Sequence, residues 1–206
     1  MQIAVLAFDG FNEIDSFVVS NLLNRLRPQG WNAWITAPGD RVASKNGVVV
    51  EAQRPLEFAA SADAVVVGSG TRTDEIAEDP AMLARIRLDP ARQLIASQCS
   101  GALILAALGL LKSRRACTDL VTKPLFEGSG IEILDQPFDA NGTVATAGGC
   151  LASQYIAAWM IARVAGEASA RDALFAVAPV GEKDAYIDRA LGAIRPFLVS
   201  RARLAS

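Results

Sequence analysis

The sequence contains no histidine among its 206 residues. This absence excludes a Ser-His-Asp or Cys-His triad within the chain. It also removes the side chain that most often binds transition metals. Acid–base chemistry near neutral pH must therefore come from carboxyl, thiol or backbone groups.

Cysteine is scarce, with three residues in the chain and no CxxC pair among them. An odd number without paired spacing argues against a disulfide scaffold and against a zinc knuckle. We therefore expect no metal and no organic cofactor. Each cysteine is either a buried core residue or a reactive thiol.

Long charged and long apolar runs are missing as well. Twenty basic and 22 acidic residues give a net charge of −2, and without a long basic run we expect no nucleic-acid partner. No apolar run reaches the length of a membrane span, so no membrane partner is expected. The apolar start, 1–8, lacks a basic flank and predicts a first strand rather than a signal peptide. These features predict a cytoplasmic protein acting on a small molecule.

Apolar segments along the chain predict strands that alternate with helices. Short continuous apolar runs at 3–8, 64–67 and 94–97 are typical of strands covered on both faces. Further strands are expected at 31–36, 116–118, 131–134 and 144–147, with a hairpin at 42–52. Helices are expected at 11–26, 73–88 with a break at Pro80, 102–111, 120–127, 151–164 and 186–199. This order predicts one α/β domain over 1–206, with a mostly parallel sheet, helices on both faces and a small edge hairpin.

Helix 11–26 shows amphipathic spacing. Its apolar residues on one side are Ile14, Phe17, Val18, Leu22 and Leu26.

Cys99 follows the strand at 94–97 directly and precedes a helix. A residue on a sharp strand-to-helix turn stands out of the sheet, which is the geometry of a nucleophile elbow. Gly101 leaves room for the helix to cross the strand closely. The N-terminus of the following helix is expected to favour a thiolate, and its N–H groups could hold an oxyanion.

Other interpretations of the cysteines remain open. Free cysteine is among the most buried residue types, so Cys99 could be a core residue. Cys117 lies beside a predicted strand and is interpreted as inert core. Cys150 follows Gly148-Gly149 at another strand end, and Gly68-Ser69-Gly70 ends a third strand. Because ligands bind beyond the carboxyl ends of strands in such sheets, Cys150 could line the same pocket as Cys99.

Several motifs resemble the ThiJ/PfpI superfamily, whose fold resembles class I glutamine amidotransferases. They are Ser97-Gln98-Cys99-Ser100-Gly101-Ala102, the step Leu108-Gly109-Leu110-Leu111, Phe8-Asp9-Gly10-Phe11-Asn12-Glu13-Ile14-Asp15, Val67-Gly68-Ser69-Gly70 and Ala145-Thr146-Ala147-Gly148-Gly149. The resemblance covers roughly residues 3–164 and implies a flavodoxin-like three-layer sandwich. It also implies a homodimer with Gly149-Cys150 close to the partner.

The resemblance implies a role for Asp15, because family members place an acidic residue there against the cysteine. Aspartate rather than glutamate makes the sequence most similar to the isocyanide (isonitrile) hydratase branch. The alternative role for Asp15 is to stabilise the first turn of its helix. Backbone N–H groups of Gly70 and Ser100 are the candidates for holding negative charge.

Three positions depart from the family pattern. Ser100 stands where the protease-like members have histidine, so a peptidase lacks its base. Thr118-Asp119 stand where many relatives have a histidine, which makes Asp119 a pocket candidate or a surface loop acid. Cys150 stands where hydratase relatives have a small or apolar residue, which leaves the substrate open.

The activity implied is cysteine-dependent addition of water to an isocyanide, giving an N-substituted formamide through a Cys99 thioimidate with Asp15 as general acid and base. One alternative is glyoxalase- or deglycase-like action on α-oxoaldehydes. Another is a non-catalytic ligand or redox sensor that uses oxidation of Cys99. Some relatives carry a helix-turn-helix module, and we do not expect one here, because the sequence ends at Ser206.

Overall fold

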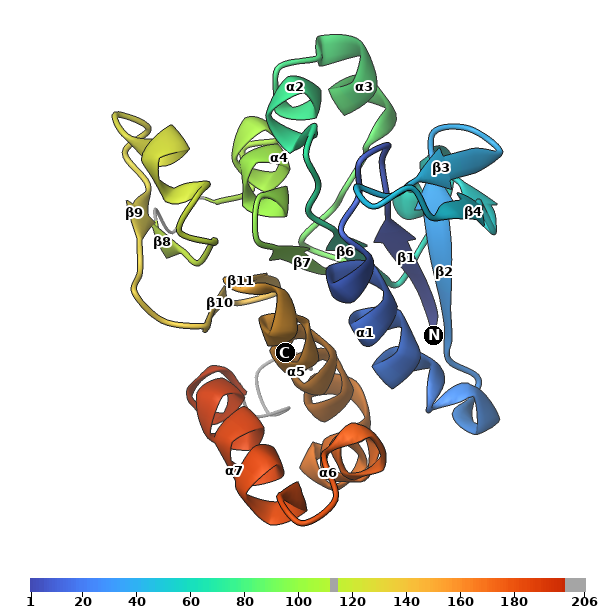
Figure 1. The fold of residues 1–206 in the computed structure, drawn as a ribbon, viewed down its shortest axis with the longest axis vertical. Coiled ribbons are helices and arrows are strands. Elements are labelled where there is room, and N and C mark those ends of the chain that lie inside the picture. The colour runs from blue at the N-terminus through green and yellow to red at the C-terminus, as the bar shows by residue number, and fades with distance from the viewer. Residues whose placement is uncertain (112–114, 199–206) are drawn as a thin grey trace.

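The computed structural model describes residues 1–111 and 115–198. A seven-stranded sheet lies at its centre (Figure 1), in the order β10-β11-β7-β6-β1-β2-β5. The strands of this sheet are β1 (Gln2–Leu6), β2 (Asn32–Ala37), β5 (Arg54–Pro55), β6 (Ala64–Val67), β7 (Leu94–Gln98), β10 (Phe138–Asn141) and β11 (Val144–Ala147). Every neighbouring pair is parallel except β10 with β11.

Helices cover both faces of the sheet, which confirms the predicted α/β architecture (Figure 1). The α-helices are α1 (Glu13–Asn24), α2 (Thr73–Ala77), α3 (Pro80–Arg85), α4 (Gly101–Ala107), α5 (Ser153–Ala165), α6 (Glu167–Val177) and α7 (Lys183–Ile194). Short 3-10 turns are η1 (Arg27–Gln29), η2 (Leu56–Ala60), η3 (Lys123–Phe126), η4 (Cys150–Ala152) and η5 (Arg195–Phe197). No helix in the described ranges is long and apolar enough to cross a membrane.

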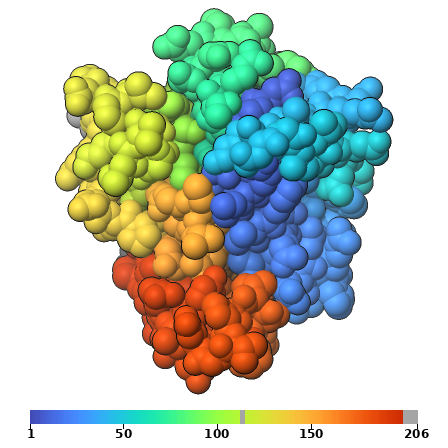
Figure 2. All heavy atoms as spheres, viewed as in Figure 1, coloured from blue at the N-terminus to red at the C-terminus, as the bar shows by residue number. Residues whose placement is uncertain are grey.

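Two hydrophobic cores lie on opposite faces of the sheet because strand side chains alternate in direction. Val5 of β1 packs with residues of α1, α5, α6 and α7 in one core. Leu6, the next residue, packs with residues of η2 and α4 in the other. Figure 2 shows the segment around α1 bordering on the start of α5, in agreement with the packing of α1 against α5 and η4. Burial on both faces explains why β1 and β6 read as continuous apolar runs.

Two small sheets stand apart from the main one. The predicted edge hairpin is confirmed as β3 (Arg41–Ala43) paired antiparallel with β4 (Val49–Glu51). The second pairs β8 (Arg115–Ala116) in parallel with β9 (Glu132–Ile133). The segment at 131–134 therefore lies outside the main sheet, and the turn at Asn141-Gly142 joins β11 to the unpredicted strand β10.

The predicted break at Pro80 is confirmed, whereas several other helix expectations need correction. Residues 73–88 form the two helices α2 and α3, as Pro80 suggested. The helix expected at 102–111 ends at Ala107, and 120–127 holds only η3. The helix expected at 186–199 is α7, displaced towards the N-terminus, and residue 199 lies outside the described ranges.

The apolar side of α1 is not its buried side throughout. Ile14 and Phe17 keep 46% and 38% of their surface exposed, whereas Asp15 and Ser16 are buried. The polar residues face the strand ends instead, so hydrophobic spacing alone gives the wrong orientation for the first turn. Because the first turn of α1 has this orientation, the Asp15 carboxyl group is buried near the strand ends.

Candidate active site

Four adjacent parallel strands, β11, β7, β6 and β1, deliver their carboxyl ends to one edge of the sheet. The loop after β1 leads to Asp15, β6 leads to Ser69, β7 leads to Cys99, and β11 leads to Cys150. Asp15, Cys99 and Cys150 come together there, with a carboxylate oxygen and both sulfurs within 4.8 Å of one another. Edges of this kind are where ligands bind in doubly wound sheets.

Cys99 has a backbone φ of +45°, and it is the one non-glycine residue with positive φ in the part of the chain that the structure describes. Its N–H donates to the carbonyl of Ala147 at 2.8 Å, and its carbonyl accepts from Thr118 Oγ1 at 2.8 Å. These bonds hold the residue in a conformation that costs free energy for a side chain with a Cβ. The strained strand-to-helix turn has the geometry of a nucleophile elbow.

Gly101 makes the close crossing at this elbow possible. A Cβ at this position would lie 2.5 Å from the carbonyl oxygen of Val67 and 2.8 Å from that of Gly68. Gly148 has the same function on the other side, where a Cβ would lie 2.2 Å from the Thr118 carbonyl oxygen. The glycines singled out in the sequence therefore allow three loops to meet around one sulfur.

Asp15 lies in the first turn of α1 with 1% of its surface exposed. Its Oδ2 accepts a hydrogen bond from the Ser69 hydroxyl, and its Oδ1 has no partner in the described part of the chain. Burial raises the pKa of Asp15 from 3.8 to about 6, although Ser69, Cys150 and Lys45 act in the opposite direction. The carboxyl group can therefore hold or release a proton close to neutral pH.

Cys99 is buried, with 3% of the residue exposed. Burial raises the pKa of this thiol well above its usual value, and the charge of Asp15 raises it further. A backbone hydrogen bond from Gly149 lowers it. The expectation that the helix terminus favours a thiolate is therefore outweighed by desolvation and by the neighbouring acid.

Two charges of the same sign in one dry site repel each other, so Asp15 and Cys99 titrate as a pair. The favoured state with one negative charge keeps one proton between the carboxyl group and the sulfur. Such a pair holds both a nucleophile and an acid without histidine.

Cys150 is half-buried and begins η4, directly after Gly149. Asn12 Nδ2 donates to its Sγ at 3.0 Å, while Asn12 Oδ1 caps α1 by accepting from the Ile14 N–H at 3.2 Å. One side chain thus fixes both the start of α1 and the sulfur of Cys150. The suggestion that Cys150 lies in the same pocket as Cys99 agrees with this geometry.

The remaining predicted residues lie around this group. The Gly70 N–H donates to the Ser100 hydroxyl at 3.3 Å, so a substrate would have to compete for it. Asp119 accepts from the Thr122 N–H at 2.9 Å and from the Val121 N–H at 3.0 Å, which caps its own turn. With Gly149 it lines a hollow of about 380 Å³ whose described lining does not include Cys99.

Cys117 is fully buried behind the elbow, and burial raises the pKa of its thiol to about 12. It is not one of the three clustered donor residues. The core interpretation of Cys117 is consistent with this placement.

Sequence reasoning missed three polar residues that position the site. Ser69 holds Asp15, and Asn12 holds Cys150. Gln98 Nε2 lies 3.5 Å from Cys99 Sγ and donates to the Gly149 carbonyl at 2.6 Å. Each lies inside a motif that was recognised without being given a role. For Ser69 and Gln98, a polar residue beside a strand-end glycine or cysteine was the available signal.

Comparison with known proteins identifies the family of this chain. Residues 1–162 match the model of the DJ-1/PfpI family. The chain belongs to the DJ-1/PfpI family. The family resemblance inferred from the motifs is thereby confirmed, whereas the comparisons do not distinguish the isocyanide hydratase branch.

Individual relatives are similar over most of their length. An uncharacterised Streptomyces lividans protein, encoded in the cpoL 5′ region, is 32% identical over 121 residues, covering 57% of this chain and 86% of the relative. A DJ-1 superfamily protein from Salmonella typhimurium superposes with a TM-score of 0.69 at 27% identity, covering 83% of this chain and 94% of that one. Drosophila melanogaster DJ-1beta, with a TM-score of 0.71, 20% identity and coverage of 84% and 94%, shares the fold.

Proposed function

We propose that this DJ-1/PfpI protein is a cysteine-dependent hydro-lyase that adds water to an isocyanide and releases an N-substituted formamide. The observation that carries the proposal is the buried Asp15 carboxylate within 4.8 Å of the Cys99 sulfur. The chain contains no histidine. A nucleophile and a carboxylic acid are what this reaction needs.

In the first step the Cys99 thiolate attacks the terminal carbon of the isocyanide. The proton shared by the pair rests on Cys99, whose pKa is the higher of the two, and moves to Asp15 in the reactive form. From Asp15 it passes to the same carbon. A C–S bond and a C–H bond form, and the product is a neutral thioimidate on Cys99. Attack removes the negative charge from the sulfur while the carboxylate becomes charged, so the buried site never carries two anions.

In the second step water attacks the thioimidate carbon. The Asp15 carboxylate takes a proton from the water and gives it to the substrate nitrogen as the C=N bond becomes single. The C–S bond then breaks as the new hydroxyl group loses its proton to Asp15, which releases the formamide and regenerates the pair with its single proton. The sum is one isocyanide and one water converted to one formamide.

The burial of the sulfur supports a slender substrate. Only 3% of Cys99 is exposed, and Cys150, whose sulfur lies within 4.8 Å of the Cys99 sulfur, is half-buried. An isocyanide presents its reacting carbon at the tip of a linear group. An α-oxoaldehyde must instead bring a trigonal carbonyl and an adjacent C–H to the same two residues.

The test is product formation by the reduced protein. We expect an alkyl isocyanide to give the corresponding formamide, followed by NMR, and methylglyoxal to give no lactate. Lactate without formamide would replace this proposal with the oxoaldehyde activity. Neither product, together with selective oxidation of Cys99 at low peroxide, would favour the sensor.

A homodimer and a cytoplasmic location remain predictions. A homodimer would cover apolar side chains that are exposed near the site, namely Ile14 and Phe17 on α1 and Leu151 on η4. Light scattering during size-exclusion chromatography should give twice the chain mass of 21.7 kDa. A monomer at micromolar concentration would contradict the prediction.

A further inference from the structure

The second sulfur in the site has no part in the proposed reaction. Cys150 Sγ, Cys99 Sγ and a carboxylate oxygen of Asp15 lie within 4.8 Å of one another. They come from three segments that the sheet brings together, the end of β7, η4 and the first turn of α1. Two sulfurs and a carboxylate at such separations form a set of three convergent donors.

An unpartnered oxygen points to a missing ligand in this group. Asp15 is 1% exposed, and its Oδ1 has no hydrogen-bond partner in the described ranges. Buried polar atoms are normally paired, and an unpaired one is costly. The other oxygen accepts from Ser69, which fixes the carboxyl group beside the two sulfurs.

The chemistry of the donors selects a class of ligand. Thiolates are soft ligands that bind Zn²⁺ well. Zinc sites often have three protein ligands and one open position. Zn–S bonds of about 2.3 Å in a tetrahedron place two sulfurs roughly 3.8 Å apart. The observed upper limit of 4.8 Å needs a contraction of the order of 1 Å or less.

Neighbouring groups are suited to thiolate ligands. Gly149, which precedes Cys150, has a φ of +88° and open space where a Cβ would lie, so no side chain there obstructs the group. Asn12 Nδ2 donates to Cys150 Sγ at 3.0 Å, and Gln98 Nε2 lies 3.5 Å from Cys99 Sγ. Amide donors to the sulfurs are the outer contacts that orient thiolate ligands in metal sites.

We propose that Asp15, Cys99 and Cys150 bind one thiophilic divalent cation such as Zn²⁺, and that the ion blocks the chemistry of Cys99. The ion uses the sulfur lone pair that would attack a substrate and the carboxylate that would move its proton. The site is thus inhibitory rather than catalytic. Metal binding does not depend on the identity of the substrate, so the proposal stands apart from the isocyanide reaction.

The experiment uses the full chain, reduced and stripped of metal, titrated with Co²⁺ as a spectroscopic substitute for Zn²⁺. We expect one Co²⁺ per chain, with a sulfur-to-metal charge-transfer band and intense visible bands typical of a tetrahedral site. Zn²⁺ should bleach both. The C150A variant should bind at least about 10-fold more weakly, since one of three protein ligands is lost.

Cys117→Ala is the matched control, because it removes a buried thiol outside the group. It should keep the wild-type cobalt spectrum and stoichiometry. Absence of a sulfur band at saturating Co²⁺, or equal binding by C150A, would overturn the proposal.

Alkylation separates this proposal from the proposed function. Zn²⁺ should slow the reaction of iodoacetamide with Cys99 at least 10-fold in the wild type and much less in C150A, with the modified residue located by peptide mass spectrometry. This result would support the metal site even if no isocyanide were hydrated. Unchanged alkylation at saturating Zn²⁺ would contradict the site even if hydration were observed.

Discussion

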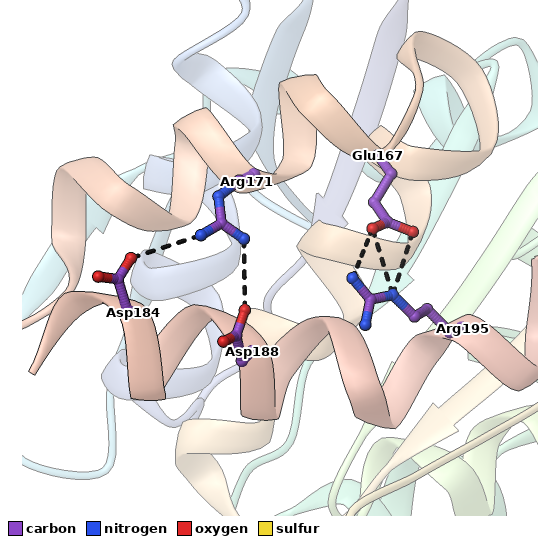
Figure 3. Close-up of polar contacts among 5 residues, drawn as sticks. All are labelled: Glu167, Arg171, Asp184, Asp188 and Arg195. Carbon is purple, nitrogen blue, oxygen red and sulfur yellow. Dashed lines mark hydrogen bonds and ion pairs between the residues drawn. The ribbon is translucent and has the colours of Figure 1, made fainter.

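The group around Cys99 and the helical hairpin of α6 and α7 differ in the surroundings of their acidic side chains. The acid near Cys99 is buried, and the acids of the hairpin are exposed and paired with arginine. Asp15 and Cys99 are 1% and 3% exposed, without a basic partner in direct contact among the described residues. In the hairpin, shown in Figure 3, Glu167 pairs with Arg195 at 2.7 Å, and Arg171 lies 3.4 Å and 3.3 Å from Asp184 and Asp188. The hairpin side chains remain largely in contact with water.

The difference shows that exposure, rather than residue type, decides whether the pKa of a carboxyl group is lowered or raised in this fold. The hydrogen bond from Arg195 lowers the pKa of Glu167. Burial raises the pKa of Asp15 to about 6. One carboxyl group is a stable charge at the surface, and the other is a proton carrier inside. The family match ends at residue 162, before the hairpin, so the two behaviours also divide between the shared part of the chain and its C-terminal part.

The largest effect is expected from removing the elbow sulfur. Cys99→Ala should lower turnover by on the order of 10³-fold or more, because the covalent intermediate forms on the Cys99 sulfur. Cys117→Ala should keep turnover close to wild type, since Cys117 is buried outside the group. Steady-state formamide production measures both variants, and circular dichroism checks their fold. Substantial activity in C99A would remove Cys99 from the mechanism.

A methyl group at the elbow should destabilise the protein strongly. In Gly101→Ala the new Cβ would lie 2.5 Å and 2.8 Å from two backbone carbonyl oxygens, which cannot move like the end of a flexible side chain. We expect a loss of roughly 3 kcal/mol in the free energy of unfolding, at the upper end of overpacking costs. Urea denaturation of the two proteins measures it. An unchanged midpoint would mean that β6 and α4 can separate easily.

Asp15→Asn should increase stability while it decreases activity. Because the folded protein raises the pKa of Asp15 from 3.8 to about 6, it binds the proton more tightly than the unfolded chain. Stability is therefore lost as pH rises from about 4 to about 6, and the cost above that range is on the order of 3 kcal/mol. The neutral amide escapes this cost.

Denaturation of metal-free D15N and wild type at about pH 4 and about pH 7.5 measures the effect. We expect the variant to gain up to about 3 kcal/mol relative to wild type at the higher pH, and little at the lower one. Equal gains at both pH values would show that packing, rather than ionisation, is responsible. Turnover of D15N should fall because its amide cannot supply the proton.

Much of the architecture was accessible from the sequence because burial on two faces leaves a simple pattern. Continuous apolar runs marked β1, β6 and β7, and Pro80 marked the boundary between α2 and α3. The short strand β10 and the helix α6 were missed. β10 is a four-residue segment with Asp139 and Asn141 in it, so it lacks an apolar run, and its alternation of apolar and polar residues is too short to mark a strand.

The site was only partly accessible for a different reason. A strand followed by cysteine and glycine indicates an elbow by itself, so Cys99 could be found locally. Asp15 was found only through the family resemblance. Hydrophobic spacing predicted that Ile14 and Phe17 lie on the buried side of the helix, whereas both are exposed. The closeness of Asp15, Cys99 and Cys150 depends on the order of strands in the sheet, which no local spacing encodes.

The same change that harms the elbow should help the hairpin. Gly192 lies in α7 with negative φ and open space where a Cβ would be. Gly192→Ala should increase stability by about 0.5–1 kcal/mol, because alanine loses less backbone entropy in a helix than glycine does. Thermal and urea denaturation beside G101A measure the contrast in sign. A loss of stability in G192A would mean that the exposed face of α7 is packed against something in solution.

The smallest effect is expected from Glu167→Gln in the hairpin. Arg195 lowers the pKa of Glu167, so the ionised form stabilises the fold above the ordinary pKa of 4.5, and the contribution disappears as pH falls. The amide should therefore cost a little stability near neutral pH, which is the opposite sign to D15N. Water and salt screen an exposed pair, so the cost should shrink further in 1 M salt. A large loss that salt does not reduce would contradict the view that the hairpin charges stay hydrated, and would place Glu167 with Asp15 among the acids that the fold removes from water.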